Sequence, residues 1–209
     1  MSALDRIAHF QNRRDEVPNQ VLAHDLAKSK DRKGIQEIAA NVWSQDKDVQ
    51  TDCIKVLYEV GYIDPTLVAG YAGDFVRLLK SKNNRLVWGG MIALGTVAHL
   101  KPDVVLAHLD EINRAMKEGS VITVDNAVLA LARAASSGDK YRKVMFPLLK
   151  NHLTTCRPKD VPQHSEKSLA AVNASNKKEF VAVLMKRLDD LSGSGLARVK
   201  KVIRQAEGS

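Results

Sequence analysis

The sequence predicts an all-α protein: a right-handed α-α superhelix of about five stacked helical hairpins and a C-terminal helix, forming one domain over residues 1–209. Three observations predict this class. Apolar residues recur with a helical period, three segments repeat at a constant offset of 37 residues, and the breaks between helices keep the same offset. With 44% hydrophobic residues in 209, the chain can bury a continuous core.

The first helix of each central repeat carries the clearest signal. Leu57, Leu94 and Leu131 are each 37 residues apart. Apolar residues around each leucine recur at i, i+3, i+4 and i+7, which is the spacing of one face of an amphipathic helix. Small residues such as Gly89 and Gly90 fall where two helices must approach closely. We therefore expect three equivalent amphipathic helices at these positions.

The breaks and the second helices align in the same way. Pro65 and Pro102 are one offset apart, and Gly138 marks the third break. Proline is tolerated in a first helical turn because its missing N–H would have no helical partner there. A hairpin cannot cover its own apolar face, so neighbouring hairpins must stack. The expected hairpins cover residues 17–44, 47–80, 84–118, 121–155 and 159–191, and the closing helix covers residues 195–206.

Two of these segments resemble a known repeat. Residues 48–61 and residues 85–98, the latter followed by Pro102, resemble the HEAT-repeat pattern, in which an Asp-x-x-Val-Arg-like start precedes Ala-Leu-Gly-x-Ile-Gly. Gln50, Val87 or Val124 replaces the usual Arg, which puts a regular Asp/Arg ladder in doubt. The resemblance implies a HEAT or armadillo-like binding scaffold whose second helices line the concave surface. Such a fold does not by itself imply chemistry.

The basic charge is confined to the last third of the chain. Residues 140–209 contain 15 Lys and Arg against 6 Asp and Glu, whereas residues 1–139 contain 17 against 18. A local basic surface favours nucleic acid, anionic lipid or an acidic protein as partner. Ordinary solubilising lysines are the alternative explanation.

Candidate binding residues follow from the repeat offset. Arg77 and Arg114 are equivalent, as are Lys80 and Lys117, and all four fall off the apolar stripe near the ends of second helices. The stabilisation of helix C-termini by cations would also explain them. Further cations would continue a basic track towards the C-terminus: Lys143, Lys150, Lys178, Lys186 and Arg187.

No spacing in the sequence indicates a metal, a cofactor or a catalytic nucleophile. The six histidines form no His-Glu-x-x-His, and neither Cys53 nor Cys156 is expected to have a histidine nearby as base or co-ligand. The two thiols are interpreted as reduced and buried. His152 is interpreted as an ordinary residue of an amphipathic helix.

One enzyme class has to be weighed against the scaffold. The run from Val42 to Gln50 loosely resembles bacterial DNA-alkylation-repair glycosylases, which are HEAT-like and use groove aromatic residues with an Asp. Here Trp88 is included as a binding candidate and Asp125, one offset later, as the catalytic candidate, although Trp43 and Trp88 are interpreted first as packing residues. HEAT proteins that resemble pigment lyases, helpers that bind a protein and assist its modification, are a third class that no residue favours.

The leading interpretation is a non-enzymatic scaffold that binds a protein through its second helices. Nucleic acid, bound through basic residues 140–209, is the alternative partner. No apolar run is long enough to span a bilayer, and the start of the sequence lacks a signal-peptide layout, so a cytoplasmic monomer without a cofactor is expected.

Overall fold

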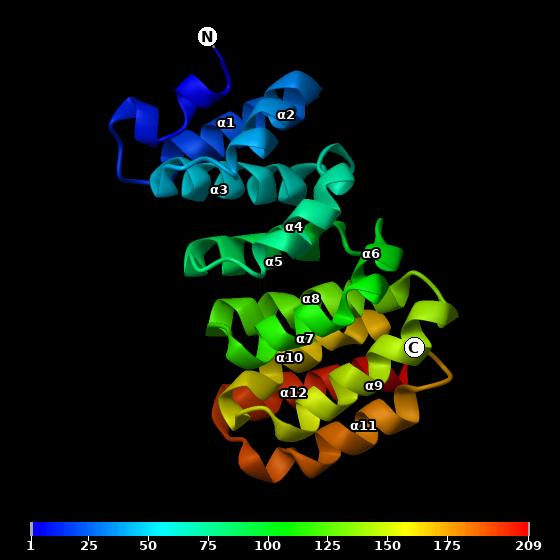
Figure 1. Cartoon of the computed structure of the whole chain (residues 1–209). Helices are drawn as coiled ribbons and strands as arrows, with labels where there is room; N and C mark the ends of the chain where they lie inside the picture. Colours follow the sequence, from blue (N-terminus) through cyan, green and yellow to red (C-terminus); the bar gives the residue numbers. More distant parts are fainter. Residues whose placement is uncertain (1, 209) are drawn as a thin grey trace. The chain divides into compact units, whose positions relative to one another are not determined.

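The computed structural model describes residues 2–208, and this range forms twelve α-helices and seven short 3-10 helices without a strand (Figure 1). The predicted all-α class is confirmed. None of the described helices combines the length and the apolar character that a membrane-spanning helix requires.

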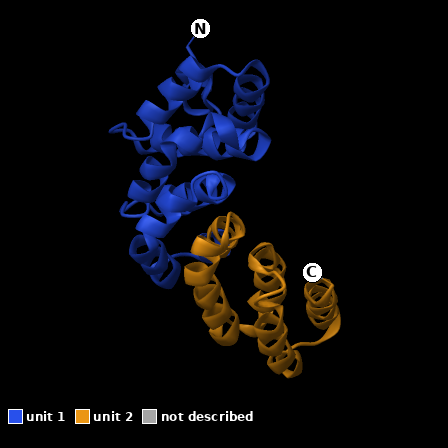
Figure 2. Cartoon of the chain, turned by 90° about the vertical axis from the view of Figure 1, so that its right-hand side faces the viewer, with its two compact units in different colours: residues 1–127 blue, residues 128–209 orange. Residues whose placement is uncertain are grey.

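The chain divides into two compact units, residues 1–127 and residues 128–209, coloured blue and orange in Figure 2. The boundary falls within helix α8 (Val121–Ser136). The first unit contains the N-terminal hairpins, and the second contains the basic part of the sequence.

In the first unit, first and second helices alternate along the chain (Figure 1). Helix α3 contacts the first helix of the hairpin before it, α1, and the first helix of the hairpin after it, α5. The second helix α2 packs on α3, and the second helix α4 packs on α5. The bounds of the helices are α1 Val17–Ser29, α2 Arg32–Asn41, α3 Lys47–Ile63, α4 Ala72–Leu78, α5 Asn84–Val97, α6 Pro102–Ala107 and α7 Leu109–Glu118. Short 3-10 helices cover Leu4–Arg6, His9–Gln11, Pro65–Leu67 and Ala69–Tyr71.

The repeated leucines have equivalent places in the fold. Leu57 lies in α3, Leu94 in α5 and Leu131 in α8, and each is fully buried. Pro65 and Pro102 each stand in the first turn of the helix that follows the break. The second helix of the hairpin expected over residues 84–118 is interrupted at His108, which separates α6 from α7, whereas the sequence pattern predicted one continuous helix there.

Glycines allow close approach of the helices in the first unit. A Cβ at Gly89 would lie 2.9 Å from Ile54 Cγ1, which places α5 directly on α3. A Cβ at Gly90 would lie 2.9 Å from the carbonyl oxygen of Phe75, so the backbones of α4 and α5 nearly touch. The prediction that small residues mark close helix contacts is confirmed at both positions.

The second unit is built from the helices that follow α8. These are α9 Asp139–Thr155, α10 Val161–Ser168, α11 Lys177–Lys186 and α12 Gly193–Glu207, with 3-10 helices at Pro158–Asp160, Leu169–Ala171 and Leu188–Asp190. Helix α9 packs on α10 and α11, and α12 packs on both α10 and α11. Phe180, Leu184, Val199 and Val202 are buried in this unit. Arg198 of α12 also forms a two-pronged ion pair with Glu166 of α10, at 2.8 and 2.7 Å.

Candidate functional site

We call the surface formed by α2, α4 and α7, which are second helices of the first unit, its second-helix surface. An exposed tryptophan lies at its N-terminal end. Trp43, just after α2, is 40% exposed, and the guanidinium carbon of Arg77 on α4 lies 4.5 Å from the centre of its ring. Arg77 Nη1 also lies 3.1 Å from Asp74 Oδ1, one turn earlier on the same helix. The surface therefore presents an aromatic ring and a cation together. Their contact joins the end of α2 to α4.

The next contact on this surface is an ion pair between repeats. Lys80 Nζ, just beyond α4, lies 3.1 Å from Glu111 Oε1 on α7, and His108 Nδ1 lies 3.7 Å from the same oxygen. The hydrogen bond from its own backbone N–H and the ion pair with Lys80 lower the pKa of Glu111. Lys80 is thus already engaged with an acidic side chain.

Arg114 and Lys117 are exposed on α7, as the repeat offset suggested. Arg114 lines a cavity of 220 Å³ together with the loop between α4 and α5 and the start of α5, including Lys82 and Val87. Trp88 lies apart from these cations: it is half-buried, and its ring centre lies 6.3 Å from that of Tyr58, as expected of a packing residue.

The second unit has a groove between its second helices α9 and α11. Two cavities of 340 Å³ each are lined by both helices, and both include Glu179 of α11. We call these two cavities the α9–α11 groove. Its lining residues are Asp139, Arg142, Lys143, Phe146, Pro147, Lys150, Asn151 and Thr154 from α9, and Ser175, Asn176, Glu179, Ala182 and Val183 from α11 and the preceding turn.

Side chains of three kinds meet in the α9–α11 groove. Lys150 Nζ lies 2.5 Å from Glu179 Oε2, which connects the two walls at the point that the cavities share. Pro147, which is exposed, and Val183, which is half-buried, supply apolar surface, whereas Phe146 is buried. The Asn151 side chain is exposed and makes no hydrogen bond among residues 2–208.

Pro147 lies inside α9, where it also changes the backbone. Proline has no N–H, so the carbonyl of Lys143 lacks the helical hydrogen bond that residue 147 would otherwise donate. The groove itself combines an amide that can donate and accept with lysine ammonium groups.

The other cations of the predicted basic track lie in different surroundings. Lys178 and Lys186 are exposed on α11, and Lys178 lines a separate cavity of 310 Å³. Arg187 is only 8% exposed and donates to the carbonyls of Leu153 and Cys156 at 2.6 and 2.8 Å. The expectation that Arg187 continues an exposed track is therefore wrong, because its guanidinium satisfies the carbonyls at the end of α9.

Asp125, the residue considered for base excision, is half-buried on α8.

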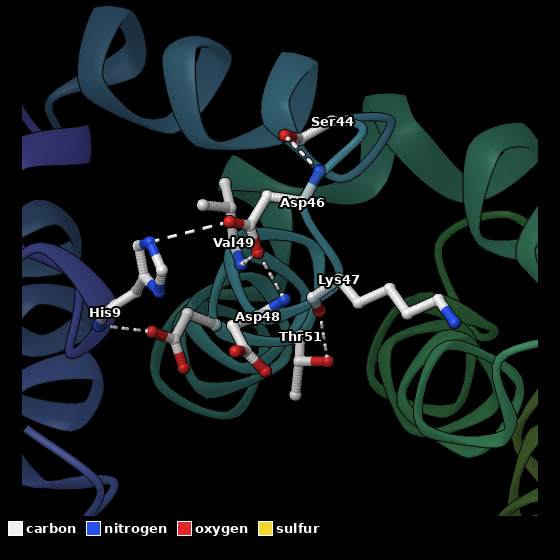
Figure 3. A network of polar contacts seen from close by, with 8 residues as sticks. His9, Ser44, Asp46, Lys47, Asp48, Val49 and Thr51 are labelled. Atoms are coloured by element: carbon white, nitrogen blue, oxygen red, sulfur yellow. Dashed lines mark hydrogen bonds and ion pairs between the residues drawn. The ribbon is translucent and has the colours of Figure 1, made fainter.

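A cavity of 630 Å³ in the first unit lies beside the N-terminal segment and is lined by Arg13, Arg14 and Arg85 together with acidic residues. Figure 3 shows the polar network next to it, in which His9 Nε2 points to Asp46 Oδ2 at 3.6 Å and the His9 backbone N–H donates to Asp52 at 2.7 Å. Asp46 accepts from the backbone N–H groups of Asp48 and Val49, which lowers its pKa and caps α3. This network holds the N-terminal segment against α3. Asp46 and Asp52 therefore have a structural role.

A second cluster was missed by sequence reasoning. His152 and Cys156 at the end of α9 and His164 of α10 bring one potential ligand atom each to within 4.8 Å of one another. The prediction that neither cysteine has a histidine nearby is therefore wrong for Cys156. The i, i+4 spacing of His152 and Cys156 was the available signal, because it places both on one side of a helix.

Comparison with known proteins gives a fold and no closer relation. No family model and no curated protein matches the chain. Two engineered proteins from a structural genomics consortium are similar in structure, each with 18% identity and a TM-score of 0.65, and the match covers 100% of this chain and 98% or 100% of theirs. A designed armadillo repeat protein in complex with the peptide (KR)4 has 14% identity and a TM-score of 0.67, covering 99% of each chain. The expected helical-repeat solenoid is thus confirmed as an armadillo-like fold.

Proposed function

We propose that this chain, with its armadillo-like fold, is a non-enzymatic scaffold that binds an extended acidic segment of a protein partner in the α9–α11 groove. The observation that carries the proposal is the groove itself, which lies between two second helices and combines lysines, apolar surface and a free amide. It belongs to the part of the chain in which 15 basic residues face 6 acidic ones.

The lining of the groove fits a polypeptide backbone. A primary amide such as that of Asn151 can donate to a carbonyl and accept from an N–H of the same extended chain. Pro147 and Val183 provide apolar contacts for side chains of the ligand. These groups recognise a backbone without demanding a particular sequence.

The cations select the charge of the ligand. Lys143 and Lys150 line the groove, and complementary charge is what orients and steers a partner. The structure of the designed armadillo protein to which this chain is similar is a complex with the basic peptide (KR)4. Because the α9–α11 groove has lysines on its wall, we propose a ligand of the opposite sign.

A binding assay tests the proposal directly. We expect a fluorescent peptide of alternating Asp and Glu to bind the full chain at low salt, as followed by anisotropy, and a Lys-Arg peptide of equal length not to bind. Lys143→Glu with Lys150→Glu should weaken binding roughly ten-fold or more, because two surface charge pairs become repulsive. Lys200→Glu, an exposed change on α12, is the matched control.

The outcomes separate the alternatives. Equal binding of both peptides, or unchanged binding by the double variant, would refute the groove. Tight binding of a DNA duplex that weakens steeply with salt, without binding of the acidic peptide, would favour the nucleic-acid alternative instead.

We propose that the second-helix surface of the first unit also contacts a protein. An exposed Trp beside an Arg is a pair of residue types that often dominates binding energy. Trp43 and Arg77 form such a pair, with Lys80, Arg114 and Lys117 nearby on the second helices. Arg77→Glu with Arg114→Glu should abolish capture of a partner by this surface, while the peptide affinity of the α9–α11 groove stays unchanged. An intact interaction after the double change would exclude this surface.

A further inference from the structure

We propose that His152, Cys156 and His164 form a zinc site. The three residues converge at the end of α9, on the side of that helix turned away from the α9–α11 groove. Two imidazole nitrogens and a thiolate sulfur are a donor set that suits Zn²⁺, a borderline-soft ion commonly bound by Cys and His. The inference is therefore independent of the function proposed above.

The distances fit a small cation. His152 Nε2 and His164 Nδ1 lie 2.9 Å apart, and the three ligand atoms are all within 4.8 Å of one another. Ligand atoms of a tetrahedral zinc ion are separated by roughly 3.3–3.6 Å, given the usual Zn–N and Zn–S distances. On binding, the nitrogens would move apart by a few tenths of an ångström, and the sulfur would approach them by up to about 1.2 Å.

Residues around the three ligands also hold them in place. His164 is 1% exposed, so its ring has little freedom to turn away from His152. Arg187 donates to the backbone carbonyl of Cys156 at 2.8 Å and to that of Leu153 at 2.6 Å, which fixes the chain at the end of α9 where Cys156 stands. Support of this kind, one layer beyond the ligands, orients them and tunes the affinity for the metal.

The protons follow from the ligand atoms. In the metal-bound form His152 carries its proton on Nδ1 and His164 carries its proton on Nε2, which leaves the two facing nitrogens free to donate their lone pairs. The thiol of Cys156 loses its proton to solvent when the Zn–S bond forms. Three protein ligands leave the fourth position to water or to a group from a partner.

Cobalt provides the spectroscopic test. The reduced, metal-free full chain is titrated with Co²⁺, and we expect one equivalent to bind with a sulfur-to-cobalt charge-transfer band and the intense visible bands of tetrahedral coordination. Zn²⁺ should then displace the cobalt, whereas Mg²⁺ should not. Absence of the charge-transfer band at one equivalent would overturn the proposal.

Variants identify the ligands. Cys156→Ser should remove the charge-transfer band. His152→Gln should lower the affinity by more than about a hundred-fold, because a change behind the ligands costs about 10–100-fold. Cys53→Ala and His24→Gln, which alter a thiol and a histidine of the first unit, should leave cobalt binding intact. Retention of the band in Cys156→Ser would exclude the site.

A second measurement guards against loss of folding in the variants. In the Cys53→Ala background, Cys156 is the one remaining thiol. One equivalent of Zn²⁺ should slow its reaction with an aromatic disulfide reagent at least ten-fold, and a chelator should restore the rate. An unchanged rate with Zn²⁺ present would contradict coordination through sulfur.

Discussion

Replacing Gly90 by alanine tests how closely the helices pack in the first unit. The new Cβ would lie 2.9 Å from both the Phe75 carbonyl oxygen and Leu78 Cβ. A backbone oxygen cannot turn aside as a long side chain can, so α4 must move away from α5. Gly73 in α4 offers the matched control, because a Cβ there meets nothing within 4 Å.

The two changes should have opposite signs. Overpacking costs about 1–3 kcal/mol, and the higher helix propensity of alanine returns up to about 1 kcal/mol. Gly90→Ala should therefore lower the free energy of unfolding of the first unit by about 1–2 kcal/mol. Gly73→Ala should raise it by about 0.5 kcal/mol, because only propensity changes and the position lies in a first turn.

Tryptophan fluorescence during urea unfolding measures both variants, since Trp43 and Trp88 both belong to the first unit. With a urea m-value of about 2 kcal/mol/M, Gly90→Ala should lower the midpoint by roughly 0.5–1 M. A midpoint at or above that of the unchanged protein would show that α4 and α5 can separate without cost, and the close packing argued above would be wrong.

Three further outcomes are expected. Arg187→Met should cost about 2–4 kcal/mol and speed hydrogen exchange at the end of α9, because two buried carbonyls lose a charged donor, whereas Lys186→Met should stay within about 0.5 kcal/mol. The Lys55 side chain is only 10% exposed and lies 2.7 Å from each of two glutamates. Lys55→Met should therefore lower the free energy of unfolding, measured with urea, by about 1–3 kcal/mol, and the exposed change Lys28→Met is its control. Burial raises the pKa of Cys53 to about 12, far above the value near 8.5 of a thiol in the unfolded chain. Because the unfolded chain loses this proton first, the free energy of unfolding should fall as the pH rises from 8 to 10. A Cys53→Ala variant whose free energy of unfolding falls equally over this pH range would contradict the argument.

The sequence predicted the parts of the fold that depend on local pattern. Helical periodicity and the offset of 37 placed Leu57, Leu94 and Leu131 in equivalent buried positions, and the glycines marked the close contacts. The break at His108 was missed because the apolar spacing continues through it. A repeat pattern shows which face of a helix is buried and leaves open where the helix is interrupted.

The candidate sites depend on contacts that no local pattern contains. Lys150 contacts Glu179, which is 29 residues later in the sequence. His152 of α9 contacts His164 of α10, which is 12 residues later. Arg187 looked like its exposed neighbour Lys186, but it reaches back to carbonyls more than thirty positions earlier. Charge counting therefore found the basic part of the chain and misassigned one of its members, because exposure is set by tertiary packing.

Under the proposed function, the ion pair between Lys150 and Glu179 makes binding to the α9–α11 groove competitive. A ligand carboxylate that reaches Lys150 must replace one that is already in place, and Glu179 is then left facing an incoming chain of its own sign. A single acidic residue gains little from this exchange, whereas a run of them can also engage Lys143 and offset the repulsion. Glu179 thus sets a threshold of charge density, and its conversion to glutamine should let the groove accept more weakly acidic ligands and lose selectivity.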